Sequence, residues 1–163
     1  MRRYILFFLL CVLFFLIPLQ AFVIGDYVGI GIQGAVYRLQ WTGYGTFFFP
    51  ITRELVFVLN GTYSGRTALS VILWLAGSVL LACTTIYAFF HLDNAEPGYY
   101  RQIAYGLIAA CGIWLGSCIA QYGIIFHSAG GFSIPLGILL ILGWVAIIPI
   151  YQKFSERLAG PEE

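Results

Sequence analysis

Three long stretches without a charged residue constrain this chain more than any other feature of its sequence. Asp, Glu, Lys and Arg are absent over 22, 26 and 51 consecutive residues, at positions 4–25, 67–92 and 102–152. Because a helix rises about 1.5 Å per residue and a bilayer core is about 30 Å thick, the first two stretches each fit one membrane span and the third fits two. The glycine pair at 130–131 favours a turn inside the third stretch. The pattern predicts four helices, near residues 4–24, 67–91, 102–126 and 134–152.

The composition excludes a soluble domain. Hydrophobic residues make up 61% of the chain and charged residues 9%, whereas soluble domains carry about 25% charged residues. The net charge is +1, and the basic residues form no cluster. The sequence therefore has no positively charged region of the kind that binds nucleic acid. We predict a single membrane domain over residues 1–163, with the lipid bilayer as its partner. Its fold class is mainly α, an integral membrane four-helix bundle with a small β-containing outer segment.

The first stretch has two interpretations. Arg2 and Arg3 precede an apolar run over residues 5–19, which is typical of a signal peptide with a poor cleavage site at 19–21. The alternative is an uncleaved signal anchor. We favour the anchor, because apolar sequence continues through residues 22–24 and so reaches the length of a span.

The distribution of basic residues predicts the orientation in the membrane. Four spans place both termini on one side, which holds five basic residues in short segments: Arg2, Arg3, Arg101, Lys153 and Arg157. The opposite side has three, all within one long segment. By the positive-inside rule, both termini are expected to be cytoplasmic, with residues 25–66 and 127–133 facing outward from the cell (plasma) membrane.

The outer segment 25–66 has the pattern of strands. Val28, Ile30 and Ile32 alternate with two glycines and Gln33, and a period of two residues is typical of a strand. We predict a small sheet of two or three strands lying on the membrane surface between the first and second helices. An extended glycine-rich loop is the alternative.

A short apolar segment separates this sheet from the second span. Residues 51–59 are too few to cross a bilayer and carry Arg53 and Glu54, so we predict an interfacial or buried helix. The next three residues, Asn60-Gly61-Thr62, read both as a turn and as a glycosylation sequon, and we favour the turn.

Residues suited to catalysis or cofactor binding are scarce. No predicted span contains Asp, Glu, Lys or Arg, which argues against a proton relay or a charged-substrate transporter. His91 and His127 fall at opposite ends of spans, about 30 Å apart, so one haem cannot join them. The four cysteines are dispersed without a C-x-x-C spacing. We therefore expect no catalytic residue, no cofactor and no metal ion.

Small residues on the third predicted helix form a candidate packing face. Gly112, Gly116 and Ala120 recur every four residues, with Gln121 beside them. Such spacing lets helix backbones approach closely in lipid, and an amide can hydrogen-bond across the contact. One interpretation is that this face packs the protein's own bundle. The other is a seam for a partner helix or a second copy.

Aromatic residues in the outer segment form a candidate interaction surface. Exposed aromatic side chains mark contact sites, and the candidates here are Tyr27, Tyr37, Trp41, Tyr44 and Phe48. The alternative is that these rings seat the segment on the lipid interface.

The plan of the chain resembles that of the claudin-like tetraspan membrane proteins. It shares a cytoplasmic N-terminus, a long first outer segment with strand character, a cytoplasmic loop and a short second outer turn. The resemblance is one of topology, and it implies a small sheet in the first outer segment. Residues 28–41 would supply that sheet, and residues 64–69 the entry to the second span.

We therefore predict a non-catalytic tetraspan protein that acts by lateral association and by contact through its outer segment. Its expected partner is a second copy or another membrane protein. The first alternative is an accessory subunit of a larger membrane oxidoreductase or transporter complex. The second is a small carrier or enzyme for an apolar substrate, using Gln121, Tyr122 and His127 near the outer face.

Overall fold

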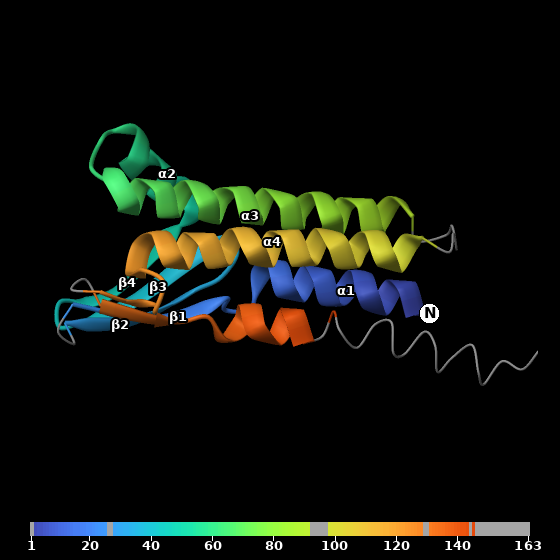
Figure 1. Ribbon diagram of the computed structural model, residues 1–163, viewed down its shortest axis with the longest axis horizontal. Helices are drawn as coiled ribbons and strands as arrows, with labels where there is room; N and C mark the ends of the chain where they lie inside the picture. The colour runs from blue at the N-terminus through green and yellow to red at the C-terminus, as the bar shows by residue number, and fades with distance from the viewer. Residues whose placement is uncertain (1, 26–27, 92–97, 129–130, 144, 146–163) are drawn as a thin grey trace, which may run out of the picture.

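The computed structural model describes residues 2–25, 28–91, 98–128, 131–143 and 145. It is mainly helical, with an antiparallel sheet at one end of an elongated molecule. Helices run along the long axis in Figure 1, and the sheet lies at the end away from the N-terminus. The labelled helices are α1 (Arg2–Phe15), α2 (Ile51–Leu59), α3 (Gly65–Phe90) and α4 (Tyr99–Tyr122).

Two of these helices, α3 and α4, are long and apolar enough to cross a membrane. The prediction of helices over 67–91 and 102–126 is correct for their existence and close for their bounds. Helix α4 begins three residues earlier than predicted and ends at Tyr122, before Gly123 with its φ of 84°. A positive φ is readily adopted by glycine and ends the helix there.

The first predicted helix, 4–24, is too long. Helix α1 has 14 residues and ends at Phe15, three residues before Pro18. Proline has no N–H for the helical ladder and disfavours helix in the residue before it. The apolar residues beyond it, which we took to extend an anchor, form strand β1 (Gln20–Ile24) instead.

The sheet has six strands in the order β4-β3-β2-β1-β6-β5, with every neighbouring pair antiparallel. Besides β1 they are β2 (Gly29–Gln33), β3 (Tyr37–Thr42), β4 (Gly45–Pro50), β5 (His127–Ser128) and β6 (Gly131–Ile134). Strand character between residues 28 and 41 was predicted correctly. Segment 25–66 supplies three strands, within the predicted two or three, but β1, β5 and β6 from outside this segment join the same sheet, which was not predicted.

The short outer turn predicted at 127–133 is also wrong. Strands β5 and β6 form a hairpin there, and β6 pairs with β1, where Phe22 lies opposite Ser133. This pairing joins two segments that are more than a hundred residues apart. The outer structure is therefore built from both ends of the chain rather than from residues 25–66 alone.

The fourth predicted helix, 134–152, is described only in its first part. Residues 136–143 and 145 are helical, while residue 134 belongs to β6. The remainder, 146–152, lies outside the described residues. The helical segment is drawn in orange beside α1 in Figure 1, and the Ile138 N–H donates to the Leu19 carbonyl.

The segment before α3 forms the predicted short helix and turn. Helix α2 covers residues 51–59 as expected, and a turn follows it at Asn60 and Gly61, where Gly61 has a φ of 73°. In Figure 1, α2 lies at the same end of the molecule as the sheet.

Four helical segments share one apolar core. Its buried side chains include Leu10 from α1, Trp74 from α3, Leu107 from α4 and Ile138 from the last helical segment. Helices α3 and α4 lie close together at Gly77, where an added Cβ would lie 2.5 Å from Nε1 of Trp114. The absence of a side chain at Gly77 is what lets the Trp114 ring lie against α3.

Candidate functional site

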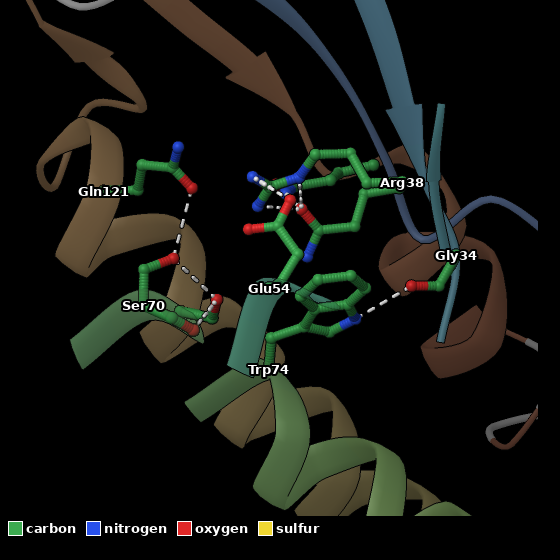
Figure 2. Close-up of polar contacts among 9 residues, drawn as sticks. Gly34, Arg38, Glu54, Ser70, Trp74 and Gln121 are labelled. Carbon is green, nitrogen blue, oxygen red and sulfur yellow. Dashed lines mark hydrogen bonds and ion pairs between the residues drawn. The ribbon is translucent and has the colours of Figure 1, made fainter. Parts of the chain in front are cut away.

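A buried ion pair joins the sheet to helix α2. Nη1 of Arg38, on β3, donates to Oε1 of Glu54 at 3.1 Å, and the two side chains are only 6% and 1% exposed. Both residues lie in the outer segment, and each has its charge in the protein interior. A charge removed from water needs a partner and further hydrogen bonds. Figure 2 shows the pair between the sheet and α3.

Gln33 supplies the remaining hydrogen bonds of the guanidinium. Its Oε1, on the neighbouring strand β2, accepts from Nε of Arg38 at 3.1 Å and from Nη2 at 2.8 Å. Register explains the contact, because Gln33 lies directly opposite Arg38 in the β2–β3 ladder. Arg38 is therefore held by an amide from the next strand and a carboxylate from the following helix.

Two aromatic rings flank the same guanidinium. The carbon Cζ of Arg38 lies 5.3 Å from the centre of the Trp74 ring and 5.6 Å from that of Phe22, within the range of cation–π attraction. Phe22 reaches this position because its cross-strand partner is Gly31, where any Cβ would collide with the ring. Nε1 of Trp74 donates to the Gly34 carbonyl at 2.9 Å, as Figure 2 shows.

The hydrogen bonds continue from Gln33 across β1 to β6. Nε2 of Gln20 donates to Oε1 of Gln33 at 3.0 Å, and Oε1 of Gln20 accepts from Ser133 at 2.8 Å and from the Cys118 thiol at 2.7 Å. The chain of contacts links β1, β2 and β6 with α4. We call Gln20, Gln33, Arg38, Glu54 and Ser133 the buried polar cluster.

A second polar contact joins α3 to α4 nearby. The Ser70 hydroxyl lies 3.0 Å from that of Ser117 and donates to Oε1 of Gln121 at 3.2 Å. The Ser117 hydroxyl donates to the Ser70 carbonyl at 2.8 Å. Gln121, singled out as a packing residue, therefore forms an interhelical hydrogen bond within the chain.

Burial governs the acidity of Glu54. Desolvation raises the pKa of its carboxyl above the ordinary value of 4.5, while Arg38 and, more weakly, the Tyr63 hydroxyl and Arg53 oppose the shift. Within the described residues, Oε2 of Glu54 has no partner of good hydrogen-bond geometry. The free oxygen is visible in Figure 2, on the side of the carboxylate away from Arg38.

The buried polar cluster has the chemistry of a structural element. Apart from Oε2 of Glu54, its hydrogen bonds join its own members, and the Cys118 thiol donates to the Gln20 amide oxygen. In the part of the chain that the structure describes, no three His, Cys, Asp or Glu side chains lie together as metal ligands. The cluster fixes the position of the sheet against α3 and α4.

The predicted packing residues lie along one stripe of α4 but differ in their burial. Gly112 is exposed, and an added Cβ there would meet no atom within 4 Å, whereas at Gly116 it would make ordinary contact with Leu73. Ala120 is half-buried. The close contact between α3 and α4 uses Gly77 and Gly106 instead, and Gly106 lies against Thr84.

The predicted outer residues divide between the sheet and a hairpin tip. Tyr37, Trp41 and Phe48 lie on the face of the sheet that points away from the buried polar cluster. Tyr44 forms the tip of the β3–β4 hairpin and is 89% exposed. Tyr27 lies outside the described residues.

The residues nominated for an apolar-substrate site have three different surroundings. Tyr122 is buried at the end of α4, His127 is exposed on β5, and Gln121 is held by Ser70. The structure adds Arg38, Glu54 and Gln33, which the sequence reading did not single out. The available signal was Arg38 itself, a charge at the centre of a run of strand-forming residues.

No family model, no curated protein and no solved structure matches this chain. The functional argument therefore rests on the residues and their geometry.

Proposed function

We propose that this chain is a non-catalytic integral membrane protein that crosses the bilayer and acts by associating with a second copy or another membrane protein. The main support for the proposal is the length of α3 and α4. Their 26 and 24 residues correspond to about 39 and 36 Å of helix. Either length exceeds the roughly 30 Å of a hydrocarbon core. The proposed arrangement has four crossing segments with both termini in the cytoplasm of a cell whose plasma membrane holds the protein.

The outward side chains of these helices support the membrane location. On α3, Ile72, Val79 and Ile86 are each about half exposed, and Ile108 on α4 is similar. The three residues of α3 recur every seven positions, or about every two turns, along one side of the helix. Leaving a band of large aliphatic side chains in water is unfavourable, and lipid removes that cost.

The exposed face of α4 is the proposed seam for association. Gly112 lies on this face together with the exposed Ala109, and Gly116 borders it. The single observation that favours a partner is the open space at Gly112, since the contact with α3 does not use this glycine. Small residues facing lipid let another helix approach closely.

The experiment that tests the seam compares two substitutions of equal bulk. Gly112→Leu fills the open face of α4, while Ala76→Leu adds a similar side chain on the exposed face of α3. Native mass spectrometry from mild detergent should show an assembly for the wild type and for Ala76→Leu. Gly112→Leu should shift the population toward the monomer at least severalfold.

Two results would contradict the proposed seam, and a third would favour a different function. A wild-type chain that is monomeric in native lipid, or an assembly unaffected by Gly112→Leu, would contradict the seam. A complex of fixed stoichiometry with different subunits would identify an accessory subunit, and the chemistry would then lie on the partner.

A second contact is proposed at the tip of the β3–β4 hairpin. Tyr44 projects there with 89% of its surface exposed, and tyrosine is enriched among residues that dominate binding. Replacing Tyr44 with Ala should weaken a contact on the outer side without changing the helix seam. The same native mass spectra report the result.

A further inference from the structure

The polarity of the sheet is the reverse of that in a water-soluble protein. A one-sided antiparallel sheet in water packs its apolar face on the core and exposes its polar face. Here the face toward the helices carries the buried polar cluster. The opposite face, which we call the free face, exposes large apolar side chains: Ile30, Trp41, Phe48 and Ile134.

Helix α2 has the same inverted polarity. Its one fully buried residue is Glu54, at 0% exposure, while Val56 and Leu59 are 48% and 75% exposed. The sheet thus turns polar groups inward and apolar groups outward, and α2 buries the charge of Glu54 while Arg53, Val56 and Leu59 are exposed. Such an arrangement is expected where the surroundings are less polar than the interior.

The sheet lies beside the helices rather than beyond their ends. The Gly34 carbonyl accepts from Trp74, and the Ala35 carbonyl accepts from the Ser78 hydroxyl. On α3, exposed apolar residues run from Leu69 to Phe90, a rise of about 32 Å, which is close to the thickness of the hydrocarbon core. Trp74 and Ser78 lie about 8 and 14 Å inside the outer limit of this band.

The positions of Trp74 and Ser78 along α3 show how deep in the apolar band the strands lie. The loop that joins β2 to β3 lies inside the apolar band, and the strands run from it toward the outer end of α3 (Figure 1). Along the free face, Leu39 is deeper than Trp41, which in turn is deeper than Tyr44. A strand rises about 3.3 Å per residue, so Leu39 to Thr42, the last residue of β3, covers about 10 Å, and Tyr44 lies beyond it in the turn.

We infer that the sheet is set into the outer leaflet of the bilayer, with its free face against lipid. The deep half of the face, at Leu39 and Phe48, contacts acyl chains. Trp41 lies at the boundary, where aromatic side chains are enriched, and Tyr44 reaches the headgroups. The inference rests on the proposed crossing of the membrane by α3 and α4.

The backbone at the deep end suits an apolar surrounding. Backbone groups in lipid must be satisfied within the protein, and here the N–H of Gly34 donates to Tyr37 and that of Ile51 donates to Val36. Pro50, at the deep end of the edge strand β4, has no N–H to leave unpaired. The opposite ends of the strands, with the hairpin tips, reach the level at which water is available.

Nitroxide accessibility in lipid vesicles tests the inference. Single spin labels are placed at Leu39→Cys, Phe48→Cys and Tyr44→Cys, with Val79→Cys on α3 as the control for the membrane span. Cys11 and Cys83 are replaced by Ala, since the other two cysteines are buried. Collision rates are measured with molecular oxygen, which concentrates in lipid, and with a water-soluble nickel chelate.

The expected pattern is graded along the sheet. Labels at Leu39 and Phe48 should collide with oxygen severalfold more than with nickel, as Val79 does, and Tyr44 should show the reverse. Having two deep positions guards against one variant that fails to fold.

Each of the other possible accessibility patterns contradicts either this inference or the proposed membrane span. Nickel access at both deep positions, with Val79 in lipid, would place the sheet above the membrane and contradict only this inference. Shielding of both deep positions from both reagents would show that protein covers the free face, which also contradicts it. Nickel access at Val79 would instead remove the proposed membrane span itself.

Discussion

At the scale of single residues, Arg38 determines how the sheet meets the helices. Its guanidinium touches four elements: it is hydrogen-bonded to Gln33 on β2, paired with Glu54 on α2, and stacked between Phe22 on β1 and Trp74 on α3. Arginine suits this position better than lysine, because its planar group can form hydrogen bonds at its edge while its faces lie on rings.

Replacing Arg38 should therefore destabilise the fold strongly. Arg38→Met removes the partner of a buried carboxylate, and breaking such a pair costs about 3–5 kcal/mol. The matched control is Arg53→Met, because Arg53 also lies over two aromatic rings, Phe49 and Phe57, but is exposed. The control should lose less than about 1 kcal/mol. Denaturant unfolding in mild detergent measures both, and equal losses would contradict the structural role of the ion pair.

The ion pair was missed in the sequence for a physical reason. The sequence predicts a surface sheet around Arg38 and an interfacial or buried helix around Glu54, but it indicates no partner for either charge. Their pairing depends on the register of β2 and β3 and on the place where α2 docks, which no local pattern encodes. The alternation of Gln33 with isoleucines did mark two faces, but it did not reveal that the polar face points inward.

At the scale of elements, the contact between α3 and α4 depends on two glycines outside the G-x-x-x-G spacing. Gly77 receives the Trp114 ring, and Gly106 lies against Thr84. Each glycine faces a large or branched side chain on the other helix. The glycine motif at 112–116 makes no equivalent contact within the chain, so the two pairs of glycines have different roles.

Adding one methyl group should separate these roles. Gly77→Ala places a Cβ 2.5 Å from Nε1 of Trp114, and overpacking of this kind costs about 1–3 kcal/mol. Gly112→Ala meets open space and should leave the stability of the monomer unchanged or raise it by up to about 1 kcal/mol, because alanine favours helix. Thermal unfolding of the detergent-solubilised monomer compares the two variants. A larger loss for Gly112→Ala would contradict this assignment.

The elements differ in how well the sequence predicts them. Helices α3 and α4 were predicted within a few residues, because a charge-free stretch of spanning length leaves few other structures. Helix α1 was overextended because length was given more weight than Pro18. Strands β5 and β6 were missed, since their partner β1 lies far away in the sequence and had itself been assigned to a helix.

At the scale of the whole molecule, one end is built from helices alone and the other combines helices with a sheet. Helix α1 has only 14 residues, about 21 Å of helix, and strand β1 continues in the same direction beyond it (Figure 1). The sheet thus occupies the length that a longer first helix would fill. A polar interior and an apolar free face are what allow a sheet to occupy that place.

The arrangement predicts which ends of the molecule face each side of the membrane. Tyr44 lies at the sheet end, whereas Gly98, just before α4, lies at the end where α1 begins with Arg2 and Arg3. The positive-inside rule assigns the arginine end to the cytoplasm.

In a background without Cys11 and Cys83, Tyr44→Cys should react with a membrane-impermeant maleimide on intact cells. An added Cβ at Gly98 would lie 4.0 Å from Nε2 of Gln102, an ordinary contact, and Gly98→Cys should react only after the cells are permeabilised. Reaction of both on intact cells would show that α3 and α4 do not cross the membrane, and the reverse pattern would invert the orientation, which would place the sheet in the cytoplasmic leaflet.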